Sequence, residues 1–103
     1  MTPKDHLPYD LHIVLETGEK LWKIARLFAK NGWATRECSW TEFEIQSTDA
    51  DLLLAPASPP LLSGGVSDDP EAVDRILTLL DSAAIPYAYE VYDEADVLIR
   101  SGP

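Results

Sequence analysis

Two helical segments, each with a single apolar stripe, are the feature that most limits how this chain can fold. Apolar residues recur at spacings of three and four over residues 18–31 and again over residues 69–84. A helix of this kind buries one side only, so both helices are expected on one face of a shared sheet. The residues predicted to be buried in these stripes are Leu21, Ile24, Phe28, Val73, Ile76, Leu77 and Leu80.

The segments around the helices have the composition and alternation of strands. Extended chain is predicted for residues 11–16, 33–47, 52–55, 87–92 and 97–99, with a bulge or bend near Trp40. The prolines of residues 56–60 exclude a central strand there, and residues 61–65 are predicted to lead into the second helix. The order β-α-β-β-α-β, with a possible extra C-terminal strand, predicts a two-layer α+β fold of the ferredoxin-like type, with two helices on one face of an antiparallel sheet.

The start of the second helix has the clearest local signal in the sequence. In the segment Ser67-Asp68-Asp69-Pro70-Glu71, Asp69 is suited to cap free backbone amides and Pro70 to occupy the first helical position. The helix is therefore predicted to begin there.

A chain of 103 residues suits one domain. Residues 1–10, with Pro3 and Pro8, are predicted to form an extended N-terminal arm, and residues 11–103 a single α+β domain. The N-terminal residues lack the apolar segment of a signal peptide, and no apolar run is long enough to span a bilayer. The one cysteine, Cys38, excludes an internal disulfide and is expected to be buried. A cytoplasmic protein is the resulting expectation.

The charge is strongly negative and uneven. Eighteen acidic and eight basic residues give a net charge of −10, which disfavours a nucleic-acid partner. Residues 37–67 contain five acidic groups and no basic one. The first helix, in contrast, carries a basic face formed by Lys20, Lys23, Arg26 and Lys30.

No constellation for catalysis or for cofactor or metal binding is found. His6 and His12 lack a third ligand at a recognisable spacing. The glycines of Ser63-Gly64-Gly65 are not followed by the lysine of a phosphate-binding loop, and the aspartates do not match a calcium-binding loop. No catalytic, cofactor-binding or metal-binding residue is therefore predicted, and the protein is expected not to be an enzyme.

Acidic and aromatic side chains instead predict a protein-binding surface. Helices on one face of a sheet leave the other face uncovered, and aromatic side chains there would be adhesive. Carboxylates around such side chains suit a basic protein partner. The predicted partner-binding residues are Glu37, Trp40, Glu42, Glu44, Asp49, Asp51, Tyr89 and Tyr92.

The function expected from this surface is that of a non-enzymatic acidic binding protein, of the inhibitor or immunity type, which covers a basic surface of another protein. The alternative is a small-ligand-sensing regulatory module of ferredoxin-like fold, and a small enzyme comes third. No nucleic acid and no membrane are expected as partners, and the chain is expected to be a monomer or a homodimer.

Overall fold

The computed structural model describes residues 7–39 and 41–103, which form seven strands and two helices. In chain order these are β1 (Tyr9–Leu15), α1 (Leu21–Lys30), β2 (Ala34–Glu37), β3 (Phe43–Ser47), β4 (Ala50–Ala55), β5 (Leu61–Val66), α2 (Pro70–Ser82), β6 (Tyr87–Tyr92) and β7 (Leu98–Gly102). The predicted N-terminal arm lies mostly in residues 1–6, outside the described residues, and β1 begins at Tyr9.

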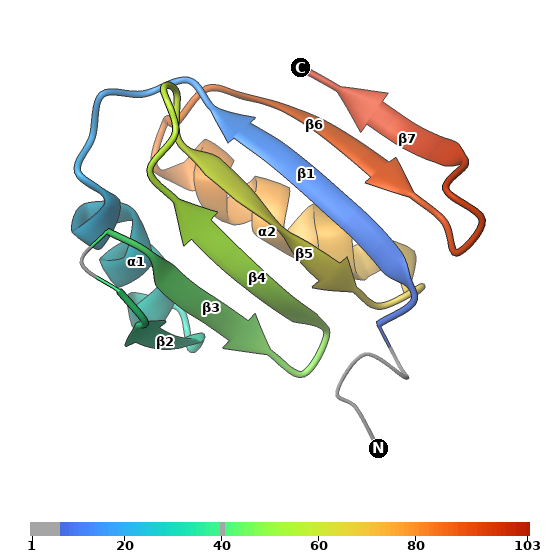
Figure 1. Cartoon of the computed structure of the whole chain (residues 1–103), viewed down its shortest axis with the longest axis horizontal. Helices are drawn as coiled ribbons and strands as arrows, with labels where there is room; N and C mark the ends of the chain where they lie inside the picture. The colour runs from blue at the N-terminus through green and yellow to red at the C-terminus, as the bar shows by residue number, and fades with distance from the viewer. Residues whose placement is uncertain (1–6, 40) are drawn as a thin grey trace.

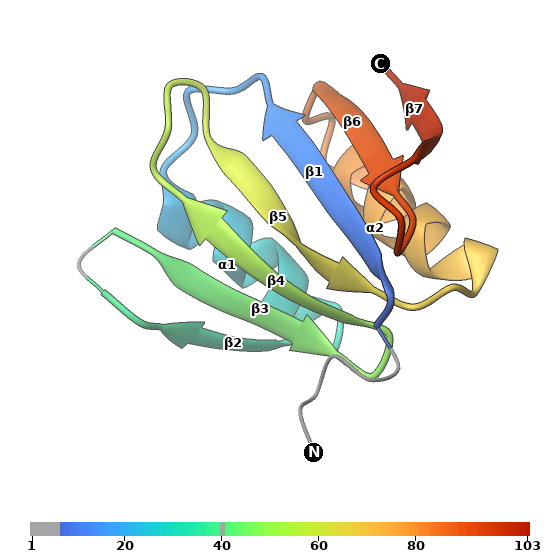
Figure 2. The same cartoon turned by 45° about the vertical axis from the view of Figure 1, so that its right-hand side comes forward.

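The seven strands form one antiparallel sheet in the order β2-β3-β4-β5-β1-β6-β7. Strand β1 lies between β5 and β6, so it connects the four strands β2 to β5 with the strands β6 and β7. Both helices lie behind the sheet in Figure 1, and the view in Figure 2 places them on that same side. The prediction of an antiparallel α+β fold with two helices on one face is confirmed.

The ferredoxin-like strand order, however, is wrong. Four strands separate the two helices instead of two. The predicted bend near Trp40 is a complete hairpin between β2 and β3, although Trp40 itself lies outside the described residues. In addition, residues 61–66 form strand β5, which pairs with both β4 and β1. Two adjacent glycines are typical of a loop, and for this reason residues 61–65 were predicted to lead into the second helix and not to form a strand.

Gly64 is required by the close approach of β5 to β4. Its φ angle is +154°, and a Cβ atom built on it would lie 2.1 Å from the carbonyl oxygen of Asp51. A side chain at this position would therefore collide with the backbone of the neighbouring strand. The glycine permits the pairing of β5 in the middle of the sheet.

The hydrophobic core fills the space between the sheet and the helices. Alternate residues of β1, namely Leu11, Ile13 and Leu15, are fully buried, as are Ile24 and Phe28 of α1. The predicted stripe of α2 is buried too, with Val73, Ile76, Leu77 and Leu80 in the same cluster. Leu21 is only partly buried and packs at the margin of the cluster.

Local signals account for the ends of the helices. Asp69 caps α2 by accepting a hydrogen bond of 3.0 Å from the backbone N–H of Glu71, and Pro70 is the first helical residue, as predicted. Helix α1 begins at Leu21, three residues later than predicted. The hydroxyl of Thr17 accepts a hydrogen bond from the N–H of Glu19, which holds residues 17–19 in a turn and delays the helix.

Candidate protein-binding face

The uncovered face of the sheet is the most extensive candidate site, and we call it the open face. In β1, β3, β4, β5 and β6, one set of alternate residues faces the helices and includes the buried side chains, so the other set points to the opposite side. The register places Glu44, Leu53, Ser63, His12 and Glu90 opposite one another on neighbouring strands from β3 to β6. Each of these residues belongs to the set that faces away from the helices.

Apolar side chains form a continuous row across this face. Ala55 of β4 lies opposite Leu61 of β5, Leu61 lies opposite Val14 of β1, and Val14 lies opposite Ala88 of β6. Val14 is 37% exposed, although an apolar side chain at the centre of a sheet is usually covered. We call these four residues the apolar row. Leu53, half-buried on the same face, borders it.

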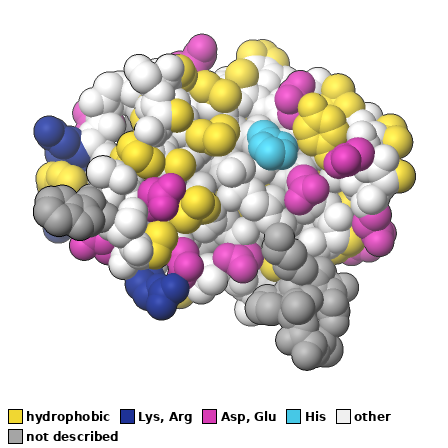
Figure 3. All heavy atoms as spheres, in the orientation of Figure 1, with side chains coloured by type: hydrophobic (Ala, Val, Ile, Leu, Met, Phe, Trp, Pro, Cys, Tyr) yellow, Lys and Arg dark blue, Asp and Glu magenta, His cyan; other side chains and the backbone are white. Residues whose placement is uncertain are grey.

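Carboxylates lie on the same face as the apolar row. Figure 3 shows acidic and apolar side chains interspersed over this face, whereas lysine and arginine side chains are seen only at its left and lower left edges. The register identifies Asp10, Glu44, Asp51 and Glu90 as acidic residues of the open face. The face therefore combines a strip that favours contact with another surface and charges that favour a cationic one.

Two of these carboxylates, Asp10 and Glu90, line a shallow hollow of about 550 Å³ together with a third, Asp96. We call it the acidic hollow, and its lining residues are Asp10, His12, Glu90, Tyr92 and Asp96. The rings of His12 and Tyr92 meet edge to face with centroids 5.9 Å apart. The Tyr92 hydroxyl donates a hydrogen bond of 3.0 Å to Oε1 of Glu90, and this bond is the main reason why the pKa of Tyr92 is raised.

The carboxylates of the acidic hollow are among the acidic groups that have no ion pair within the described chain. The ion pairs of the described residues involve Glu19, Glu44, Asp49, Asp69, Glu71 and Asp74. None involves Asp10, Glu90 or Asp96. Their charges are therefore available to a cationic group from outside.

The predicted partner-binding residues are only partly brought together. Glu44 and Asp51 lie on the open face, and Tyr92 lines the acidic hollow. Glu37 is exposed at the end of β2, and Glu42 lies just before β3. Trp40, the predicted centre of the surface, lies outside the described residues.

Two of the predicted residues point elsewhere. Tyr89 lies on the helix-covered face, where its hydroxyl accepts a hydrogen bond of 3.0 Å from Nε of Arg100. Asp49 pairs with Arg75 of α2 at 2.5 Å. Of the aromatic residues predicted for the binding surface, Tyr92 lies on the open face, where it lines the acidic hollow.

The absence of local counter-charge in the acidic stretch, inferred from the sequence, is also corrected. Arg36 of β2 lies opposite Glu44 of β3 and binds its carboxylate at 2.6 Å, and Arg75 reaches Asp49 from a distant part of the chain. The residues next to these carboxylates in the sequence therefore do not identify the basic groups that pair with them.

Cys38, which was expected to be buried, is exposed, because it follows the edge strand β2.

Most residues of the apolar row and of the acidic hollow were not predicted from the sequence. Alternation in residues 9–15 and 87–92 was the available signal for Asp10, His12, Val14, Ala88 and Glu90. That signal defines two faces, but it does not say which strands are neighbours. The apolar row depends on the position of β5 between β4 and β1, and the sequence pattern does not give that position.

Comparisons with protein-family models, with curated proteins and with solved structures give no match. In the described part of the chain, no group of three or more histidine, cysteine, aspartate and glutamate residues is arranged to hold a metal ion. Neither of the two helices described is long and apolar enough to cross a membrane.

Proposed function

We propose that this protein is a non-enzymatic binding protein whose open face lies against a cationic surface of another protein, in the manner of an inhibitor or immunity protein. The observation that carries the proposal is the apolar row on the same face as carboxylates that have no ion pair within the described chain. Burial of the row supplies affinity, and the carboxylates speed the encounter and select a partner rich in lysine and arginine.

The two features have separate roles in this proposal. Contact with the apolar row removes Val14 and Leu61 from water, which stabilises the complex once formed. Asp10 and Glu90 lie in the acidic hollow on the same face, where a lysine or arginine of the partner can approach both the carboxylates and the ring of Tyr92. Glu37 and Glu42 are proposed to lie at the rim of the same contact.

The experiment begins with capture of the partner from the native host, followed by association and dissociation rates with the purified partner at two salt concentrations. Val14→Lys places a cation in the apolar row and should weaken binding at least about tenfold, or about 1.4 kcal/mol. Thr78→Lys adds the same charge on the exposed side of α2 and serves as the matched control.

A second pair of variants tests the charges. Glu90→Gln should slow association and reduce its dependence on salt, because a steering charge is removed. Asp81→Asn makes the same change of charge on α2 and should have a smaller effect. If the control variants weaken binding as much as the open-face variants do, the partner binds elsewhere and the proposal fails.

The second candidate is a small-ligand-sensing regulatory module, now without the ferredoxin-like strand order. A groove on the helix side of the molecule favours it, because apolar walls and nearby cations suit an anionic ligand.

A further inference from the structure

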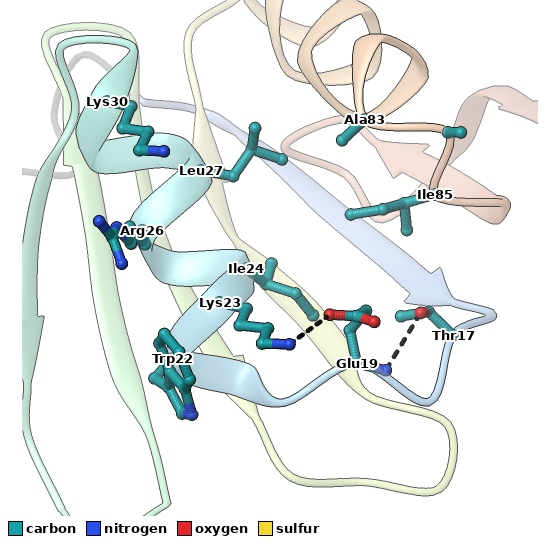
Figure 4. A pocket seen from close by; sticks show the side chains of 11 residues that line it. Thr17, Glu19, Trp22, Lys23, Ile24, Arg26, Leu27, Lys30, Ala83 and Ile85 are labelled. Carbon is teal, nitrogen blue, oxygen red and sulfur yellow. Dashed lines mark hydrogen bonds and ion pairs between the residues drawn. The ribbon is translucent and has the colours of Figure 1, made fainter.

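A groove on the helix side runs between α1 and the chain that follows α2. Its volume is about 640 Å³, and Ile24 and Leu27 of α1 lie along one wall. Ala83, Ala84 and Ile85 form the other wall (Figure 4). The small side chains of the two alanines leave the space between the helices unfilled. Ala84 has a φ angle of +56°, which turns the chain out of α2 before Ile85.

The charges around the groove are mainly positive. Lys23, Arg26 and Lys30 of α1 line it, together with one carboxylate, that of Glu19. Lys23 pairs with Glu19 at 3.7 Å, whereas Lys30 has no ion pair within the described chain. Arg26 points to the far side of α1 from Ile85 in Figure 4. Lys30, assisted by Lys23, is therefore the cation best placed to meet a ligand in the groove.

This positive character is unusual for the molecule. The hollows on the open face, and the one lined by Trp33 and Glu71, contain more carboxylates than lysine and arginine side chains. The groove has the opposite balance in a chain with a net charge of −10. An anion that approaches the protein is therefore repelled over most of the described surface and attracted at this place.

We infer that the groove binds a small amphiphilic anion, with an apolar body against Leu27 and Ile85 and a carboxylate or similar group near Lys30. The volume lies within the range of small-molecule sites. A small ligand is favoured over an acidic protein segment because a large anion would also meet the repulsion of the acidic surface. This inference goes beyond the proposed protein binding, since the groove and the open face lie on opposite sides of the sheet.

Decanoate is the probe, and decan-1-ol is its uncharged counterpart. Titration of the isotope-labelled protein, followed by amide chemical shifts, should show changes at Leu27, Lys30 and Ile85 with saturation. Decan-1-ol should bind at least about tenfold more weakly, because it lacks the charge that the lysines attract. Equal affinity for the two compounds, or shifts centred on the open face, would overturn the inference.

Variants test the two halves of the site separately. Lys30→Gln should weaken decanoate binding at least about threefold and leave decan-1-ol binding unchanged. Arg36→Gln, which removes a cation from β2, is the matched control. Ala83→Leu should fill the groove and weaken both compounds, whereas Ala95→Leu in an exposed turn should weaken neither. Binding that survives Ala83→Leu would contradict the assigned place. None of these measurements requires the protein partner, so either proposal can fail alone.

Discussion

At the scale of single residues, Gly64 shows how a backbone contact determines which amino acid a position accepts. The atom nearest to an added Cβ is a carbonyl oxygen of β4, which is held by the sheet and cannot rotate aside as a side chain could. Relief of the collision would require β4 and β5 to separate at the middle of the sheet. The cost therefore falls on the pairing of two central strands.

We predict that Gly64→Ala lowers the free energy of unfolding by more than about 2 kcal/mol, because the change combines a steric collision with an unfavourable φ angle. Urea denaturation measures the effect. Gly18→Ala is the control: no atom lies within 4 Å of its added Cβ, and its effect should stay within about 0.5 kcal/mol. Equal effects of the two variants would show that β5 does not approach β4 as described.

At the scale of secondary structure, the capped end of α2 provides a test with a closely matched control. Asp69→Ala removes the oxygen that accepts from the N–H of Glu71, and it should lower the free energy of unfolding by about 1 kcal/mol. Asp68→Ala removes the same charge one residue earlier, where the side chain is exposed, and should have a smaller effect. Thermal or urea unfolding of both variants provides the comparison.

The elements differ in how well the sequence predicted them, and the reason is physical. The stripe and cap of α2 are local signals between residues a few positions apart, and they placed the helix well. Strand β5 depends on the approach of β4 and β1, so its glycines are explained only by neighbours that are distant in sequence. For the same reason, the strands β1 and β6 were predicted from their own residues, whereas the apolar row across four strands was not.

At the scale of the whole molecule, the net charge and the small size act together. The radius of gyration is 12.7 Å, which is shorter than the Debye length of about 30 Å at 0.01 M salt. Repulsion between the acidic groups is therefore almost unscreened at low salt. The ion pairs oppose it only weakly, since their side chains are largely exposed and each contributes at most about 1 kcal/mol.

Raising NaCl from about 0.01 M to about 0.15 M should therefore raise the melting temperature by a few degrees, because screening relieves the repulsion. Glu90→Gln should raise the melting temperature at low salt and reduce its dependence on salt. Calorimetric scans of both proteins at the two salt concentrations measure this. A melting temperature that falls as salt is added would instead mean that the ion pairs outweigh the repulsion.

The central place of β1 also has a consequence for the order of events during synthesis. Leu11 lies opposite Gly64 on one side and Val91 on the other, so the first of the seven strands to be made pairs only with the fifth and the sixth. At about 5–20 residues per second, the strand waits on the order of several seconds for β5 alone. During that interval its apolar residues are exposed on a nascent chain. We therefore expect newly made molecules to need a chaperone at this stage, or to exchange their first strands when synthesis is crowded.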